Sequence, residues 1–161
     1  MMNSIAIGVK APRALDTILW GGLVAGVLDS IDAVIAFGLT GMNPIQVLQY
    51  VASGAIGNAA FTGGLATAAL GAALHFFIAL VVAAVYFAAT QKLSALYLKP
   101  AIWGPVYGAF VYLFMNYLVL PFSAVPKSAF SLALFLNGIL GHAIFIGFTI
   151  AWFARRSTRT K

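Results

Sequence analysis

The sequence predicts an all-α, polytopic membrane protein with four transmembrane helices. Of its 161 residues, 63% are hydrophobic and only 7% are charged, whereas soluble domains carry about 25% charged residues. The mean hydropathy of +1.02 therefore leaves too few polar side chains to cover a soluble fold. The apolar residues also fall in continuous runs, not in the short alternating segments of a membrane barrel, so the spanning elements are helices.

Four apolar runs reach the length of about 20 residues that a transmembrane helix needs. The third run ends before Pro121, and the fourth ends before Arg155 and Arg156. Residues 1–16 are expected to form an amphipathic cytoplasmic arm, and residues 154–161 a basic cytoplasmic tail. The membrane domain between them covers 17–153, with predicted spans at 17–39, 65–89, 102–120 and 131–153.

The stretch between the first two spans, 41–64, is too polar to cross a bilayer comfortably. Asn43 followed by Pro44 is typical of a helix start, with an N-cap residue before proline at the first helical position. Gln46 and Gln49 then alternate with apolar residues. We expect an interfacial or re-entrant amphipathic helix on the outer side of the membrane.

The basic residues predict the orientation of the chain. With four spans, all nine Lys and Arg residues except Lys127 fall on one side of the membrane, which the positive-inside rule assigns to the cytoplasm together with both termini. Trp20, Trp103 and Trp152 fall near the same helix ends, where indole rings favour the headgroup level. The net charge of +6 thus reflects topology and attraction to anionic membrane lipids. No nucleic-acid partner is expected, because no recognition module is visible.

Small residues predict where the helices touch, since helices in lipid associate by close packing. Small residues in all four spans favour packing within one chain, and an interface between two copies of the chain is the alternative. They are Gly22 and Gly26 in the first span, Gly71 with Ala66, Ala69 and Ala73 in the second, Gly104 and Gly108 in the third, and Gly138 and Gly141 in the fourth.

Six polar side chains inside the predicted spans form the candidate site. A charged group costs about 2.5–3.5 kcal/mol at the centre of a membrane helix, so it requires a partner or a role. Asp29 and Asp32 are three residues apart and share one helix face. Counted from the outer helix ends, polar groups of all four spans fall at a similar depth. They are Asp29, Asp32, His75, Asn116, Asn137 and His142, with Tyr112 one turn from Asn116.

This polar layer has three interpretations. In the first, the groups are hydrogen-bonded to one another and only fix helix packing. Alternatively they line a pathway for protons or small cations, because imidazole titrates near neutrality and a carboxylate stabilises its cation. A metal site is disfavoured because no HxxxH or ExxH spacing is present, and no cofactor is expected. The sequence also lacks a GxSxG motif, a P-loop and any cysteine, so we expect that the protein is not an enzyme. The alternative is an intramembrane enzyme that acts on lipid.

A series of features begins at His75 with the stretch HFFIALVVAAVY and continues with WGPVYG at 103–108 and the apolar run after His142. In this order the chain resembles the YagU-like inner-membrane proteins of bacteria. The resemblance implies a bacterial inner-membrane location, and His75 and His142 correspond to histidines of that family. Asn116 and Gly138 stand where the family leads us to expect a histidine and an acidic residue.

Two functions are therefore expected as alternatives. The first is a small channel or transporter-like protein that moves protons or small cations through the polar layer. The second is a structural or accessory subunit whose buried polar groups only fix helix packing. The expected partners are membrane lipids and either further copies of the chain or a larger membrane complex.

Overall fold

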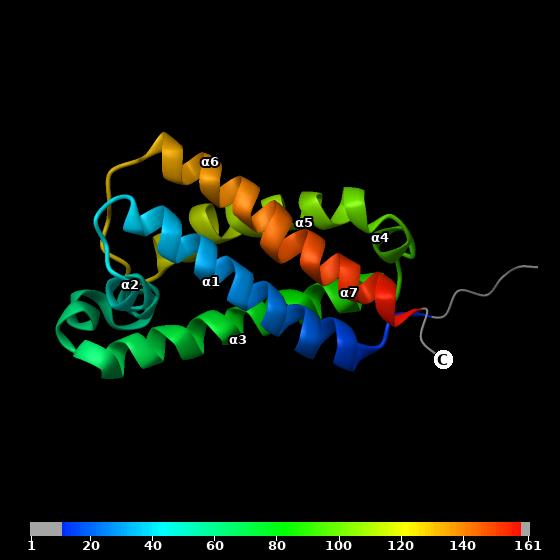
Figure 1. Ribbon diagram of the computed structural model, residues 1–161, viewed down its shortest axis with the longest axis horizontal. Helices are drawn as coiled ribbons and strands as arrows, with labels where there is room; N and C mark the ends of the chain where they lie inside the picture. The colour runs from blue at the N-terminus through cyan, green and yellow to red at the C-terminus, as the bar shows by residue number, and fades with distance from the viewer. Residues whose placement is uncertain (1–10, 159–161) are drawn as a thin grey trace, which may run out of the picture.

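The computed structural model describes residues 11–158 as four long antiparallel helices with a short helix at one end (Figure 1). Four helical stretches are long and apolar enough to cross a membrane, namely Leu15–Gly38, Gly64–Thr90, Pro100–Phe122 and Leu132–Ser157. The all-α class, the four candidate spans and the shorter helix between the first two are thus confirmed. Both ends of the described chain lie at one end of the bundle, called here the terminal end, and the short helix α2 marks the opposite α2 end (Figure 1).

Three of the four spans contain a π-helical segment. The first span consists of η1 (Leu15–Gly21) and α1 (Gly22–Gly38), and the second is the continuous helix α3 (Gly64–Thr90). After the short α4 (Ala95–Leu98), the third span runs through α5 (Pro100–Phe114), η3 (Met115–Val119) and η4 (Leu120–Phe122). The fourth consists of α6 (Leu132–Gly141), η5 (His142–Phe148) and α7 (Thr149–Ser157). The segments η1, η3 and η5 are the π-helices.

The third span continues through Pro121 instead of ending before it. Pro121 opens the 3-10 turn η4, and the chain becomes extended at Ser123. A proline at the start of a helical turn lacks only an N–H that would have no partner there. The helix therefore accepts this proline within its last turn.

Glycines allow the spans to approach closely within the chain. A Cβ added to Gly26 would lie 3.0 Å from the ring of Phe76 on α3, and one added to Gly22 would lie 3.2 Å from the Cβ of Ala83. Across the third and fourth spans, a Cβ on Gly108 would lie 2.0 Å from the carbonyl oxygen of His142. The two glycine pairs spaced four residues apart, Gly22 with Gly26 and Gly104 with Gly108, thus serve packing within one chain.

The packing surface of α3 differs from the predicted one. Ala66, Ala69 and Ala73 are exposed, whereas Ala68 and Gly71 on the same helix are buried. The choice of face could not be made from composition, because alanine occurs all round this helix.

The short helix α2 (Pro44–Ile56) begins as the sequence predicts. Asn43 and Gln46 form a capping box, in which the N–H of Gln46 donates to Asn43 Oδ1 and the N–H of Asn43 donates to Gln46 Oε1. The helix lies across the direction of the bundle and passes α3 so closely that a Cβ on Gly71 would lie 1.8 Å from the carbonyl oxygen of Leu48 (Figure 1). Helix α2 is therefore packed against the bundle and is not a free surface helix.

The polar residues of α2 do not all face outward. Gln46 is exposed, but Gln49 is only 4% exposed, and its amide donates to the carbonyl oxygen of Gly64 and to the hydroxyl of Thr67. After α2 the chain turns at Gly57, whose φ of +62° favours glycine. These contacts fix the segment between the first two spans onto the start of α3.

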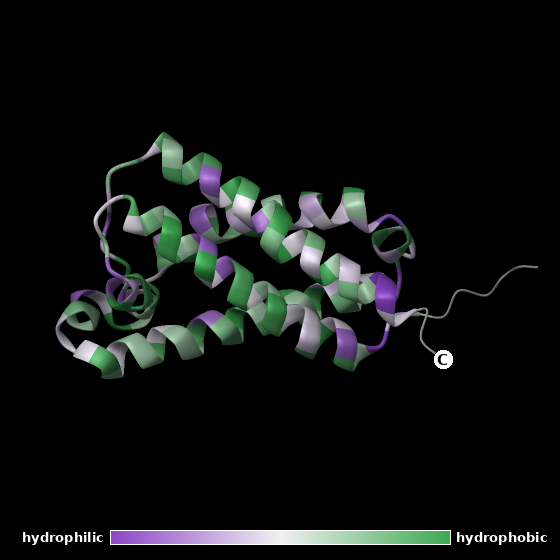
Figure 2. Cartoon of the chain, viewed as in Figure 1, coloured by the Kyte–Doolittle hydropathy of each residue, from purple (hydrophilic) through white to green (hydrophobic). Residues whose placement is uncertain are grey.

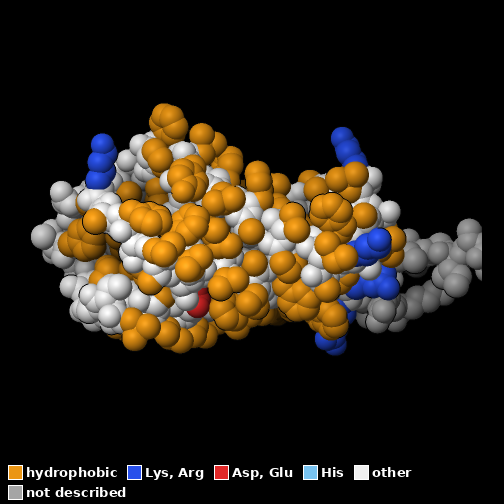
Figure 3. All heavy atoms as spheres, turned by 90° about the horizontal axis from the view of Figure 1, so that it is seen from above, with side chains coloured by type: hydrophobic (Ala, Val, Ile, Leu, Met, Phe, Trp, Pro, Cys, Tyr) orange, Lys and Arg blue, Asp and Glu red, His pale blue; other side chains and the backbone are white. Residues whose placement is uncertain are grey.

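The surface of the bundle is that of a membrane protein. Apolar side chains cover its long sides, while Lys and Arg gather at the terminal end and appear sparsely at the α2 end (Figure 3). Trp20, Trp103 and Trp152 are all exposed. The hydropathy-coloured ribbon shows the hydrophobic residues along the spans and several hydrophilic positions inside them (Figure 2).

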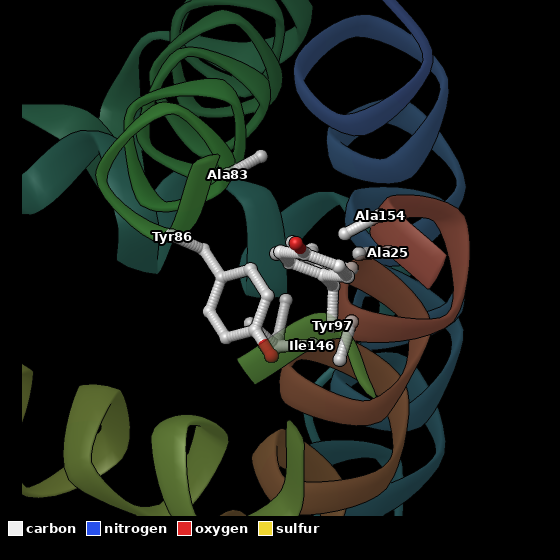
Figure 4. Packing of buried hydrophobic residues seen from close by; sticks show 8 residues of the cluster. Ala25, Ala83, Tyr86, Tyr97, Ile146 and Ala154 are labelled. Carbon is white, nitrogen blue, oxygen red and sulfur yellow. The ribbon is translucent and has the colours of Figure 1, made fainter. Parts of the chain in front are cut away.

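Residues of α3, α4 and the first and fourth spans form a compact core (Figure 4), and α4 lies at the terminal end of the bundle (Figure 1). Tyr86 of α3 and Tyr97 of α4 lie among small residues of the first and fourth spans. The hydroxyl of Tyr86 donates to the carbonyl oxygen of Leu96, and that of Tyr107 crosses from α5 to the carbonyl oxygen of Val82 on α3. The rings of Tyr86 and Tyr107 lie 4.9 Å apart. We call Tyr86, Tyr97 and Tyr107 the tyrosine cluster.

Candidate functional site

The first and fourth spans bring an acid and an imidazole together. Asp29 Oδ1 lies 3.4 Å from His142 Nδ1, and the Asp29 side chain is 12% exposed against 24% for His142. His142 Nδ1 is buried and makes no hydrogen bond to any group of residues 11–158. Buried polar atoms are almost always hydrogen-bonded, so such an atom calls for a physical explanation.

The second acid pairs with the same span one turn away. The amide of Asn137 donates to Asp32 Oδ2 over 2.9 Å, which joins α1 to α6. A Cβ on Gly141 would lie 2.4 Å from that same carboxylate oxygen, so the absence of a side chain at this position makes room for Asp32. Asp32 is half-buried. An acidic side chain reaches the apolar surface in the half of the bundle that carries α2 (Figure 3).

Tyr112 of α5 completes the group from the third span. Its ring meets the ring of His142 edge-on with centroids 5.2 Å apart, and it lies against Gly138. Asp29, Asp32, Tyr112, Asn137 and His142 thus come from three spans, and we call them the acid–imidazole cluster.

Helix geometry explains why these residues meet. At 1.5 Å per residue, Asp32 and Asp29 lie about 9 and 14 Å from the end of α1, and Asn137 and His142 lie about 8 and 15 Å from the start of α6. Because the two helices are antiparallel, each acid reaches its partner at the same depth. Figure 2 shows hydrophilic positions at this level of the bundle.

The backbone at His142 is irregular. His142 is the first residue of the π-helix η5, which follows directly on α6. π-helical turns in α-helices often mark functional sites. The carbonyl of His142 faces Gly108 of α5, where a Cβ would lie only 2.0 Å away. The imidazole therefore sits on a segment that α5 holds firmly in place.

Two of the six predicted residues make other contacts. His75 Nε2 lies 2.9 Å from the carbonyl oxygen of Gly26, so this imidazole joins α3 to the backbone of α1. The amide of Asn116 donates to the carbonyl oxygen of Tyr112 one turn earlier on its own helix. The structure thus brings four of the six residues together in pairs, while His75 and Asn116 interact with backbone carbonyls.

The cluster has acidic character. Its members include two carboxylates and one imidazole, and the basic residues between 11 and 158 lie at the helix ends. Between 11 and 158, no three His, Cys, Asp or Glu side chains are grouped closely enough to hold a metal ion. The arrangement can accept, hold and pass a proton, because an ionisable acid and an ionisable base face each other.

Sequence analysis identified Gly141 as a helix contact but not the space that it provides for Asp32. It also overlooked Thr17, which lies far from the cluster at the terminal start of the first span. Thr17 is fully buried, and its hydroxyl makes no hydrogen bond within residues 11–158. A lone threonine near the start of an apolar run gives no sequence signal for such a position.

Comparison of the chain with protein-family models, with curated proteins and with solved structures gives no match in any of the three. The resemblance to YagU-like proteins stays a sequence-based prediction. Function must therefore be inferred from the acid–imidazole cluster and the membrane architecture.

Proposed function

We propose that this polytopic membrane protein moves protons, or small cations that exchange with them, through the acid–imidazole cluster, and that it catalyses no covalent chemistry. The observation that carries the proposal is the 3.4 Å approach of Asp29 Oδ1 to His142 Nδ1, an otherwise unpartnered buried nitrogen. This distance is slightly longer than a hydrogen bond between these atoms. A small approach of the two spans makes the bond, and the proton on Nδ1 can then pass to the carboxylate. The imidazole becomes neutral, and the reverse step restores it.

Asp32 supports the same function as a second anionic group one turn away. Asn137 donates to one of its oxygens, which holds this carboxylate against α6. With Asp29 on the same helix face, Asp32 makes this part of the bundle attractive to cations and unattractive to anions. Asp32 is half-buried, so part of its side chain reaches the surface of the bundle.

The proposal is tested with purified protein in vesicles that hold a pH-sensitive dye, with an imposed potassium diffusion potential. Wild-type protein should acidify or alkalinise the interior according to the sign of the potential. Asp29→Asn and His142→Gln should reduce this flux to that of protein-free vesicles. Asp16→Asn is the matched control, because Asp16 pairs with Arg13 near the start of the first span and lies outside the cluster. Unchanged flux in the Asp29 and His142 variants, or no flux in the wild type, would contradict the proposal.

A structural or accessory role is the second candidate, and the Asp32–Asn137 bond favours it. This bond joins two spans and would stabilise packing with or without transport. The accessory role predicts that the protein copurifies with a larger membrane complex in mild detergent. Isolation as a single chain or as a homo-oligomer would count against it.

We further propose a bacterial inner-membrane location with both termini in the cytoplasm. The support is the concentration of basic residues at the terminal end and the resemblance to YagU-like proteins (Figure 3). In intact spheroplasts, Gln46→Cys should react with an impermeant maleimide, because this position is exposed at the α2 end. Gln49→Cys should be protected as the matched buried position. Labelling of Gln46→Cys only after lysis would reverse the orientation.

A further inference from the structure

The fourth span carries a cleft at its terminal end that the acid–imidazole cluster does not use. The cleft is lined by Phe148, Thr149 and Trp152, and Trp152 is 50% exposed. The rings of Phe148 and Trp152 lie side by side, with centroids 6.0 Å apart and a tilt of 35° between them. An aromatic cleft on the outside of a membrane helix faces acyl chains, and an indole near the helix end lies at the level of the headgroups.

Basic side chains continue the same face of the helix. Phe148, Trp152 and Arg156 are spaced four residues apart, so each lies one turn beyond the last. Arg156 is exposed and lies about 6 Å along the axis beyond Trp152. Helical side chains lean toward the N-terminus of their helix, so the Arg156 side chain leans toward Trp152. Arg155 adds a second cation at this end.

Among residues 11–158, no acidic side chain pairs with either arginine. The sequence has three acidic side chains, of which Asp16 pairs with Arg13 and the other two lie in the acid–imidazole cluster. Arg155 and Arg156 are therefore available to an anion from outside the protein. In a bilayer the anion at this depth is the phosphate of a lipid headgroup, which arginine binds through paired N–H groups.

We propose that this face binds an anionic phospholipid, with its phosphate at Arg155 and Arg156 and its acyl chain along Trp152 and Phe148. This binding does not depend on proton movement, so the lipid site can be tested independently of the proposed function. It predicts a preference for anionic over zwitterionic lipid, to which each arginine contributes roughly fivefold, or about 1 kcal/mol.

Trp20 provides a matched control for the experiment. It is 53% exposed, close to the value for Trp152. Along the chain, the charged residues nearest to Trp20 are Asp16 and Arg13, which pair with each other. A preference for anionic lipid caused only by exposure or membrane depth would therefore appear at both tryptophans.

Fluorescence quenching by brominated lipids tests the site. The double variant Trp20→Phe/Trp103→Phe leaves Trp152, and Trp103→Phe/Trp152→Phe leaves Trp20. Each is placed in phosphatidylcholine vesicles that contain a small fraction of brominated phosphatidylglycerol or the same fraction of brominated phosphatidylcholine. Trp152 should be quenched more strongly by the anionic lipid, and Trp20 equally by both.

Substitution of Arg155 and Arg156 by Gln should remove the difference at Trp152. Equal quenching of Trp152 by both lipids would overturn the proposal, as would a preference that survives loss of both arginines. A preference of the same size at Trp20 would also overturn it, since it would show general enrichment of anionic lipid around the protein. Far-ultraviolet circular dichroism of each variant confirms that the helices are retained.

Discussion

The tyrosine cluster and the acid–imidazole cluster differ in how their polar atoms are hydrogen-bonded. In the tyrosine cluster, the hydroxyls of Tyr86 and Tyr107 donate to backbone carbonyls over 2.8 and 2.7 Å, and Tyr86 is only 1% exposed. In the acid–imidazole cluster, side chains pair with side chains, and Asp32 and His142 remain partly exposed. Both of these tyrosine hydroxyls are hydrogen-bonded, whereas Nδ1 of His142 is buried and makes no hydrogen bond within residues 11–158.

The difference shows what a polar group in a membrane helix can be used for. A hydroxyl bonded to a backbone carbonyl carries no charge at neutral pH and joins two elements permanently. A carboxylate facing an imidazole can change charge when a proton passes between them. The tyrosine cluster therefore serves stability, and the acid–imidazole cluster is the one on which function is proposed.

The largest expected effect on stability comes from the contact between Gly108 of the third span and His142 of the fourth. Gly108→Ala would place a methyl group 2.0 Å from the carbonyl oxygen of His142. The third and fourth spans must then separate, and we expect a loss of about 3 kcal/mol in the free energy of unfolding. Unfolding of the purified protein in mixed detergent micelles measures this loss.

Gly38→Ala is the matched control, because a Cβ at Gly38 would meet no atom within 4 Å. We expect its stability to stay near that of the wild type. If Gly108→Ala were as stable as Gly38→Ala, the close approach of α5 to η5 would not hold His142 in position.

The next effect concerns the tyrosine cluster. Tyr107→Phe removes the bond to the carbonyl oxygen of Val82 and should lower the free energy of unfolding by about 1 kcal/mol. Proton flux should remain, because Tyr107 lies outside the acid–imidazole cluster. Loss of flux with retained stability would show that the two clusters do not divide stability and function between them.

The smallest effect compares two asparagines. Asn137→Ala removes a bond between spans and should lower the free energy of unfolding by about 0.6 kcal/mol, a typical value for such bonds in membranes. Asn116→Ala removes only a bond within its own helix and should have a smaller effect. Thermal unfolding of both variants in the same detergent ranks them, and the reverse order would contradict the assignment of Asn137 to the interhelical site.

The sequence by itself determined the all-α class, the four spans and the start of α2 at Asn43. Each of these depends on a local quantity, namely the transfer free energy of a continuous segment or the capping of one helix turn. The common depth of Asp29, Asp32, Asn137 and His142 also follows from the sequence, because the rise per residue of a helix is fixed.

Only the tertiary structure decided which of these groups face one another. Pairing depends on the rotation of each helix about its axis and on how closely the helices approach. Glycines far apart in the sequence, such as Gly108 and Gly141, set that approach. The same long-range packing turned His75 toward the backbone of Gly26 and buried Gln49. Depth is a property of one helix, whereas a shared site requires several helices to be placed together.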